Sequence, residues 1–273
     1  MTNSRKIDED ALADAYNEAL ALEKAGKFDA AAAAYRKVLA IDPEDHGGAA
    51  IRLASMGRGE TPPKAPDAYV ATLFDQNAEV FDDVLVDQLG YCVPLLVRQK
   101  IQEMGVGPFE RLLDLGCGTG LTGSALADMC SHITGIDLSE AMVSMAEDRE
   151  CYDDLYVGEV TEFLLDIDED PWDLIVATDV LPYIGALDDF MAGAARCSAA
   201  HGLLIFSSET ETEDHLAGRP FMVGPHQRFA HGEAYVSQRL EANGFHVIAI
   251  DPITVRYEQG APISGHLYLA RKI

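Results

Sequence analysis

The stretch that most constrains the fold of this chain is Leu112–Gly120, which reads LLDLGCGTG. Apolar residues with a single acid indicate a buried strand, and three alternate glycines indicate a tight turn after it. Gly116, Gly118 and Gly120 have no Cβ, so the backbone can adopt unusual dihedrals and a ligand can approach it closely. Helix-compatible sequence follows from Leu121. This order of strand, glycine turn and helix predicts the opening of a nucleotide-binding α/β domain.

The composition sets the size of the fold and limits its partners. The 273 residues, 48% of them hydrophobic, are enough for one large α/β domain and a small appendage. The formal net charge of −26 argues against a nucleic-acid partner, because proteins that bind a phosphate backbone need clustered Lys and Arg.

Cysteine usage and the start of the chain predict the compartment. The five cysteines are scattered without a CxxC pair, so we expect no disulfides, no metal site and a reducing environment. The polar start MTNSRKIDED is unlike a signal peptide. No apolar run approaches the ~18 residues needed to cross a bilayer. These features predict a soluble, cytoplasmic protein without a membrane partner.

Residues 1–57 are alanine-rich and helical in periodicity. Interruptions at 25–29 (AGKFD) and 41–45 (IDPED) predict two antiparallel helices followed by a third. This region resembles one tetratricopeptide (TPR) repeat over Leu12–Asp45, with small, large and proline positions taken by Ala19, Leu22, Ala31, Tyr35, Val38 and Pro43, although Ala15 stands where a large residue is expected. Because a solenoid needs about three repeats to be stable alone, two hypotheses stay open. The helices either pack on the main domain or form a groove for a protein partner.

A proline-rich linker at 58–66 (RGETPPKAP) separates this region from a second domain at 67–273. Residues 67–104 are again helical. Their apolar face either packs on the sheet or forms a helical lid over the ligand crevice, and we expect the lid. Its members are Tyr69, Leu73, Phe74, Phe81, Leu85, Leu89 and Tyr91. The α/β core is expected at 105–273.

Five alternations of strand and helix patterns follow in the core. Strands are expected at 111–115, 132–137, 154–158, 172–179 and 203–207. Helices are expected at 122–129, 139–148, 160–165 and 187–197, with Ser139 as an N-cap. This alternation predicts a doubly wound, mostly parallel sheet. A helix at 233–242 and strand-like runs at 245–257 and 263–271 add an antiparallel C-terminal hairpin.

The glycine turn alone does not identify its ligand. Gly118–Gly123 also fits the GxGxxG pattern of a dinucleotide fold, and Asp137 suits a ribose diol in either case. Asp114, expected at the carboxyl end of the first strand, favours one ligand, because a carboxylate there repels a pyrophosphate and attracts an ammonium group. S-adenosylmethionine carries an ammonium group, a sulfonium and no phosphate. Glu159, after the third strand, can lie near its adenine amino group.

These segments together resemble the class I S-adenosylmethionine-dependent methyltransferases. LLDLGCGTG (112–120), ITGIDLS (133–139), WDLIVATDVLPYIG (172–185) and HGLLIFSSE (201–209) match motifs of that family. With its TPR-like start, the chain resembles bacterial TPR-containing methyltransferases. The resemblance implies a seven-stranded sheet with an antiparallel seventh strand, and S-adenosyl-L-methionine as the cofactor.

The resemblance also implies which residues contact the cofactor. Asp114 would face the ammonium, Gly116 and Gly118 would lie under the methionine moiety, and Asp137 would hold the ribose. Glu159 stands where the family often has Asp, so the backbone N–H of Val160 is the alternative adenine contact. The other implied contacts are Cys117, Gly120, Leu138, Met142, Thr178 and Asp179.

The acceptor side is expected at the ends of the fourth and fifth strands. Asp179–Tyr183 lacks the Asn of the Asn-Pro-Pro-aromatic motif in amino-methylating members, which argues against methylation of bases or amides. Tyr183 either contacts the sulfonium through a cation–π interaction or only packs. Residues 208–232 are expected to form a long polar loop, in which Arg228 holds an acceptor carboxylate or phosphate. His231 would be a helix cap or a pocket base. The alternative for the whole segment is a solvated loop with ordinary surface charges.

The sequence therefore favours methyl transfer to a small molecule or to a group presented by a protein. Alignment of the acceptor with the sulfonium supplies much of the rate in such a reaction. One alternative is a non-catalytic S-adenosylmethionine-binding scaffold that recruits a partner through the TPR-like helices. A third hypothesis, an NAD-dependent oxidoreductase, is disfavoured by Asp114.

Overall fold

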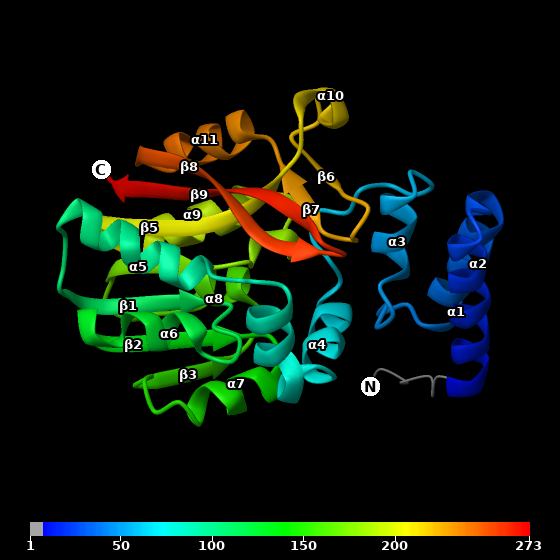
Figure 1. Cartoon of the computed structure of the whole chain (residues 1–273), viewed down its shortest axis with the longest axis horizontal. Coiled ribbons are helices and arrows are strands. Elements are labelled where there is room, and N and C mark those ends of the chain that lie inside the picture. The colour runs from blue at the N-terminus through cyan, green and yellow to red at the C-terminus, as the bar shows by residue number, and fades with distance from the viewer. Residues whose placement is uncertain (1–7) are drawn as a thin grey trace.

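The computed structural model describes residues 8–273 and shows a helical region beside an α/β sheet (Figure 1). Residues 1–7 lie outside the described residues. They are the first part of the predicted 1–57 region and most of the polar start that was compared with signal peptides. Within 8–273, no helix has both the length and the apolar character required to cross a membrane.

Five parallel strands form the centre of the sheet in the order β3-β2-β1-β4-β5. Their bounds are Phe109–Leu115 (β1), Cys130–Asp137 (β2), Asp154–Val157 (β3), Trp172–Ala177 (β4) and Ser198–Thr210 (β5). In β1, Leu112 pairs with Ile133 of β2 on one side and with Leu174 of β4 on the other. The doubly wound, mostly parallel sheet predicted from the sequence is confirmed.

The C-terminal strands form the predicted antiparallel hairpin. β8 (Phe245–Glu258) and β9 (Ala261–Lys272) are joined by Gln259 and Gly260, both with positive φ. β9 then lies antiparallel to β5, from the pair Leu203–Arg271 to the pair Glu209–Gly265. β9 therefore lies between β5 and β8.

Two further strands correct the expectation of seven strands and of an irregular loop over 208–232. β6 (Phe221–Val223) and β7 (Phe229–His231) form a short hairpin, and β7 pairs in parallel with the end of β5. A four-residue helix, α10 (Glu213–Leu216), precedes them. The described residues thus form a nine-stranded sheet. The hairpin is packed into the protein, since Val223, Phe229, Ala230 and His231 are all buried.

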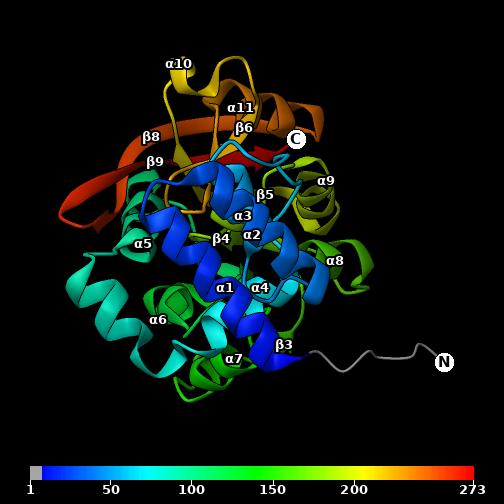
Figure 2. The ribbon, with the colours of Figure 1, turned by 90° about the vertical axis from the view of Figure 1, so that its right-hand side faces the viewer.

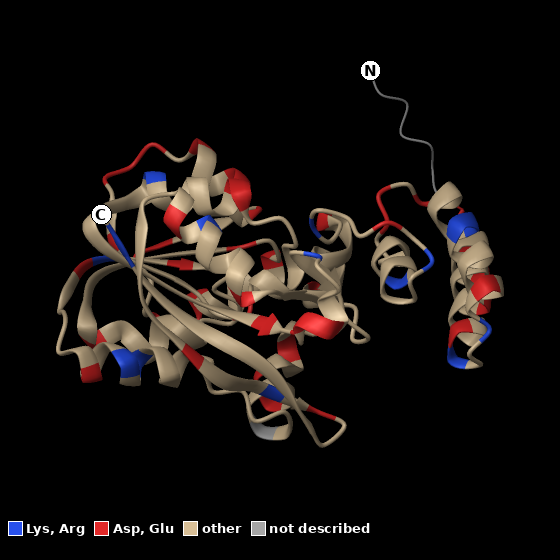
Figure 3. Cartoon of the chain, turned by 90° about the horizontal axis from the view of Figure 1, so that it is seen from above, with Lys and Arg blue, Asp and Glu red and all other residues tan. Residues whose placement is uncertain are grey.

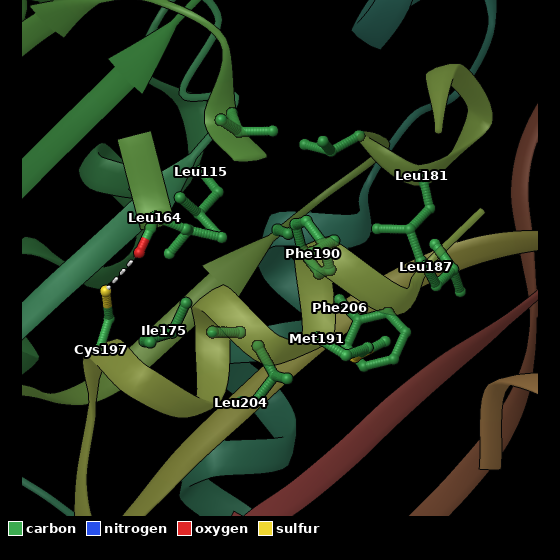
Figure 4. Close-up of a cluster of buried hydrophobic side chains, with 14 of the residues drawn as sticks. Leu115, Leu164, Ile175, Leu181, Leu187, Phe190, Met191, Cys197, Leu204 and Phe206 are labelled. Atoms are coloured by element: carbon green, nitrogen blue, oxygen red, sulfur yellow. Dashed lines mark hydrogen bonds between the residues drawn. The ribbon is translucent and has the colours of Figure 1, made fainter. Parts of the chain in front are cut away.

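Helices cover both faces of the sheet. One face packs against α8 (Val160–Asp166), α9 (Asp188–Cys197) and α11 (Glu233–Ala242), and Figure 4 shows this core around Phe190, Met191 and Phe206. The other face packs against α5 (Val93–Met104) and α6 (Leu121–Leu126), which continues into η3 (Ala127–Met129). At the end of β2, α7 (Glu140–Glu147) begins with the predicted N-cap, since the Ser139 side chain accepts the Met142 N–H.

The N-terminal region consists of three helices in front of the carboxyl ends of the strands (Figures 1 and 2). They are α1 (Glu9–Lys24), α2 (Phe28–Ile41) and α3 (Ala49–Ser55). Their interior is a small cluster of its own, in which Ala19, Tyr35 and Val38 are fully buried. The helices exist as predicted, and their likeness to a TPR repeat stays a prediction.

The linker is paired to the core rather than free. The Ala65 N–H donates to the Tyr183 carbonyl at 2.8 Å, and the Gly185 N–H donates to the Pro63 carbonyl at 2.9 Å. The proline-rich segment therefore lies alongside the turn that follows β4. It leads into α4 (Asp67–Asp75), the 3-10 turn η1 (Ala78–Val80) and the π-helix η2 (Asp83–Gln88).

Candidate functional site

A pocket lies at the carboxyl ends of the parallel strands, where an open α/β sheet binds ligands. Its floor comes from the turns after β1, β2, β3 and β4. Its roof comes from α4, η1 and η2, together with the linker and one residue from the β6–β7 hairpin. The floor residues are Gly116, Cys117, Gly118, Thr119, Leu121, Thr122, Asp137, Leu138, Glu159, Val160, Thr178, Asp179 and Val180.

The glycine turn exposes its backbone to this pocket. Gly116 and Gly118 have φ of 64° and 56°, in the left-handed region that favours glycine. A Cβ on Gly116 would lie 2.5 Å from Val180, whereas a Cβ on Gly118 would meet nothing within 4 Å. The turn is therefore packed at its first glycine and open toward a ligand at its second.

Asp137 is fixed at the end of β2 by the backbone around it. Its Oδ2 accepts the Gly118 N–H at 2.9 Å, and its Oδ1 accepts the Ser139 N–H at 2.9 Å. The side chain is nearly buried yet lines the pocket, and burial raises the pKa of Asp137 above its usual value. A carboxylate held in this way can accept hydrogen bonds from a ligand diol.

Glu159 has a structural role in addition to its place in the pocket. Its carboxylate caps α8 by accepting the Glu162 N–H at 2.8 Å. The Nζ of Lys64, from the linker, lies 4.0 Å from the same carboxylate. Val160, the first residue of α8, lines the pocket beside it.

Asp114 does not reach the pocket, which corrects its expected position at the crevice. Side chains alternate along a strand, so Asp114 points away from the face of Leu113 and Leu115. Its fully buried Oδ2 accepts the Tyr152 hydroxyl at 2.7 Å, and that hydroxyl in turn accepts the Gly123 N–H at 3.2 Å. Burial raises the pKa of Asp114 to about 7. Asp114 therefore supports the start of α6 from below.

Gly120 and Met142 also lie outside the pocket lining. Gly120 has a φ of 91°, and a Cβ there would lie 2.8 Å from the Arg149 side chain. Met142 is fully buried in α7. Both residues are packed against neighbouring side chains and do not line the pocket.

Thr178, Asp179, Tyr183 and Arg228 meet at the end of the pocket beside β4. The Arg228 guanidinium lies 5.5 Å from the centre of the Tyr183 ring and 3.4 Å from Asp179 Oδ2. Burial raises the pKa of Tyr183 to about 12, so its hydroxyl stays protonated at neutral pH. The polar groups of this end are thus an acid, a cation and hydroxyls.

His231 is not a pocket base, contrary to one sequence-based expectation. It is fully buried in β7 and absent from the pocket lining. Its Nε2 lies 2.9 Å from the Ile184 carbonyl, which can only accept, and its Nδ1 lies 2.9 Å from Ser208 Oγ. Burial lowers the pKa of His231 to about 4, so the ring is neutral at pH 7. The ring fastens β7 to the turn after β4, while Gly232 is the N-cap of α11.

Several roof residues were not identified from the sequence. The apolar face of 67–104 indicated a lid, and four of its side chains line the pocket, Phe74, Phe81, Leu85 and Tyr91, whereas Val70 was missed. Lys64, Ala65 and Ile184 line it as well. Lys64 stands between Pro63 and Pro66. A charged residue at such a position in the linker was a signal that the linker contacts the pocket.

Two contacts fasten the lid to the floor. Asp82 accepts the Thr119 hydroxyl at 2.5 Å and pairs with the Arg149 guanidinium. Asp75 accepts the Ser139 hydroxyl at 2.5 Å. Both contacts reach the turns that carry the glycines and Asp137, so the lid is coupled to the floor.

The charges of the pocket indicate the kind of ligand that fits. Acidic segments outnumber basic ones over the molecule (Figure 3), and the pocket follows this trend. Its lining contains four acids and two bases: Asp67, Asp137, Glu159 and Asp179 against Lys64 and Arg228. An excess of two negative charges favours a cationic ligand and opposes a pyrophosphate. Among residues 8–273, no three His, Cys, Asp or Glu side chains gather as a metal site.

Comparison with known proteins identifies the central segment. Residues 113–206 match the family model described as a methyltransferase domain. This segment contains the glycine turn and the acids Asp137, Glu159 and Asp179. Over these residues the chain is therefore similar to a methyltransferase domain.

Two curated relatives match a similar part of the chain. A ubiquinone biosynthesis O-methyltransferase from Maricaulis maris is 32% identical over 118 residues, covering 41% of this chain and 46% of that protein. A malonyl-[acyl-carrier protein] O-methyltransferase from Bacillus cereus is 29% identical over 139 residues, covering 48% and 49%. The chain thus spans about half the length of these relatives.

Solved structures show the same fold. The magnesium protoporphyrin IX methyltransferase from Synechocystis PCC 6803, solved with bound SAH, superposes with a TM-score of 0.52 at 17% identity. The superposition covers 76% of this chain and 87% of that one. The shared fold thus extends well beyond residues 113–206.

Proposed function

We propose that this protein transfers a methyl group from S-adenosyl-L-methionine to a small molecule or to a group presented by a protein. One observation carries the proposal. The pocket combines an open glycine backbone at Gly118 with an excess of negative charge, and its floor lies inside the segment that matches a methyltransferase domain. A cationic, phosphate-free nucleoside fits this combination, and a dinucleotide does not.

The floor supplies the groups that would hold the cofactor. Gly116, Cys117 and Gly118 would lie under the methionine moiety, and Asp137 would accept hydrogen bonds from the ribose hydroxyls. The residues expected beside the adenine and the sulfonium are Leu138, Glu159, Val160 and Thr178. When bound, the cofactor supplies an electrophilic methyl group on a positively charged sulfur.

The protein contributes mainly orientation and exclusion of water. The lid residues Phe74, Phe81 and Leu85 cover the pocket with apolar surface, which strengthens electrostatic interactions inside it. Tyr183 presents a ring at the acceptor end, where a cation can be stabilised by its face. Holding the nucleophile in line at ~3 Å accounts for much of the rate of such a transfer.

For the N-terminal helices we propose a packing role within a protein of three parts, 1–57, 58–66 and 67–273, that acts in the cytoplasm. The Ser55 hydroxyl donates to the Gly224 carbonyl at 2.8 Å, beside the hairpin that carries Arg228. The backbone hydrogen bonds between the linker and the turn after β4 also support a packing role for these helices. Capture from a cell extract of a partner bound to the exposed side of α1 would favour the alternative, a TPR-like groove.

Calorimetry and a labelling experiment test the proposal. The full chain should bind S-adenosylmethionine and not NAD, and binding of NAD alone would overturn the choice of cofactor. The chain is then incubated with methyl-labelled cofactor and a cell extract, and labelled product is expected. Tight cofactor binding without product in any fraction would favour the non-catalytic scaffold.

A further inference from the structure

Asp179 stands just after β4 in a backbone conformation that residues with a Cβ rarely adopt. Its φ of +61° is left-handed, and its N–H donates to Ser207 Oγ at 2.8 Å. A non-glycine residue in this region costs about 1 kcal/mol or more, and such residues cluster at functional sites. The fold therefore holds this carboxylate at the acceptor end of the pocket against a conformational cost.

The two carboxylate oxygens of Asp179 differ in their surroundings. Oδ2 lies 3.4 Å from Arg228 and 3.5 Å from Arg256. Oδ1 is buried and has no hydrogen-bond donor from the described residues. A buried carboxylate oxygen without a donor is costly, and one in a native structure calls for a partner. Asp179 lines the pocket, so a rotation of its carboxylate would turn this oxygen toward a ligand that supplies the donor.

The acids around Asp179 outnumber the guanidinium groups, so the cluster has no net positive charge for an anionic ligand. The cluster, built around the buried Glu209 and Arg256, has three acids and two bases: Asp179, Glu209, Glu258, Arg228 and Arg256. Arg256 binds Glu209 at 2.7 Å and Glu258 at 2.6 Å. Even a protonated His226, whose Nδ1 lies 2.6 Å from Glu258, would only make the cluster neutral. A carboxylate or phosphate added here would meet an excess of negative charge.

Strand order places Asp179 on the acceptor side. β4 adjoins β1 on the side away from β2 and β3. Asp137 and Glu159, at the ends of β2 and β3, are therefore separated from Asp179 by the glycine turn. The apolar neighbours at this end come from the roof and from the turn after β4: Leu85, Tyr91, Val180 and Tyr183.

On the basis of the proposed function, we infer that Oδ1 of Asp179 accepts a hydrogen bond from a neutral hydroxyl group of the methyl acceptor. The acceptor is then a hydroxyl compound with an apolar body, not a carboxylate or a phosphate. Arg228 does not grip the acceptor in this arrangement. It holds Oδ2 of Asp179 and covers the ring of Tyr183.

The reaction balances with the groups present. The acceptor oxygen bonds to the methyl carbon as the carbon–sulfur bond breaks, and its proton passes to Oδ1 of Asp179. The sulfur leaves as a neutral thioether, and the proton is later lost to water. General base catalysis of this kind contributes about 100-fold to 10,000-fold to a rate.

The first test is the chemical stability of the labelled product. Product formed by the full chain from methyl-labelled cofactor and a cell extract is treated with alkali. A methyl ether keeps its label, as expected here, whereas a methyl ester releases volatile labelled methanol. Alkali-labile label would overturn the hydroxyl acceptor and leave the proposed function intact. Absence of any product would overturn the proposed function, and this inference with it.

The second test uses Asp179→Asn, with Asp189→Asn, an exposed Asp at the start of α9, as the matched control. Asp179→Asn should lower turnover about 100-fold or more near pH 7, while calorimetry shows cofactor affinity within about threefold of wild type. The control should leave both values unchanged. Retained turnover in Asp179→Asn, or an equal loss of cofactor binding, would overturn the inference.

The pH dependence separates proton acceptance from a purely structural role. As the pH rises toward the ionisation of the acceptor hydroxyl, near pH 10 for a phenol, the acceptor no longer needs a base. The deficit of Asp179→Asn relative to wild type should then shrink. A deficit that is constant with pH would overturn the role of Asp179 as proton acceptor.

Discussion

The two halves of the pocket are built in different ways. The cofactor half consists of short turns at neighbouring strand ends, where Asp137 accepts backbone N–H groups from Gly118 and Ser139. The acceptor half brings together side chains from distant parts of the chain, including Tyr91, Asp179, Tyr183 and Arg228. Local hydrogen bonds fix the first half. The second half depends on a balance of charges in one cluster. Removing one of these charges should therefore destabilise the whole of that half.

The largest effect should come from breaking that balance with Arg256→Met. The change leaves the buried Glu209 and the partly exposed Glu258 without their guanidinium, so we expect a loss of about 3–5 kcal/mol in the free energy of unfolding. Urea unfolding followed by circular dichroism measures it. Arg271→Met, exposed on β9, is the control and should cost less than about 0.5 kcal/mol. Equal losses in the two variants would show that the charges are not coupled.

Asp137→Ala tests the cofactor half. It removes the acceptor of two backbone N–H groups and of the ribose hydroxyls, so affinity for S-adenosylmethionine should fall about 100-fold, or about 2.7 kcal/mol. Calorimetry gives the affinity, and Asp148→Ala, an exposed acid at the end of α7, is the control. An affinity within threefold of wild type would mean that Asp137 is not a ribose ligand.

Asp114→Asn tests the support beneath the cofactor half. Burial raises the pKa of Asp114 to about 7 from its ordinary 3.8, so between these values the folded protein holds a proton that the unfolded chain has lost. The stability of wild type should therefore fall through this group as pH rises from about 4 to 7. In Asp114→Asn the free energy of unfolding should fall between pH 5 and pH 8 by about 1–3 kcal/mol less than it does in wild type. Unfolding curves at both pH values measure it, and identical drops would contradict the shifted ionisation.

The smallest effect is expected for the contact that couples the roof to the floor. Asp82→Ala removes the acceptor of the Thr119 hydroxyl and the partner of Arg149. Because Asp82 and Arg149 are partly exposed, we expect cofactor dissociation to speed up only about threefold to tenfold. Stopped-flow displacement measures the rate, and the exposed neighbour Asp83→Ala is the control. An unchanged rate would mean that the lid opens without breaking this contact.

Much of the cofactor half could be predicted because its information is local. A few consecutive residues are enough to define each of three features: the glycine turn, the acid at the end of β2 and the Ser139 cap. The alternation of strands and helices then fixes their order around one edge of the sheet. These features depend on short-range geometry, so one sequence is enough to find them.

The sequence-based predictions that were wrong concern the direction of individual side chains and the pairing of segments that are far apart in the chain. The sequence places Asp114 at a strand end but does not show that it faces Tyr152 instead of the ligand. It places His231 before a helix, yet the ring is buried against the carbonyls after β4 because β7 joins the sheet. β7 itself was missed, since a three-residue strand depends on its partners rather than on its own pattern.

The pairing of Pro63–Ala65 with the turn after β4 has a consequence for how the protein can be cut and recombined. By composition, the segment 58–66 is an obvious place to exchange one N-terminal module for another. In the structure the same segment lines the pocket through Lys64 and Ala65 and holds the backbone beside Tyr183. A chimera joined there would inherit a different wall for the acceptor, so productive crossovers should fall before Pro63 and keep the pocket-lining part of the segment with the catalytic domain.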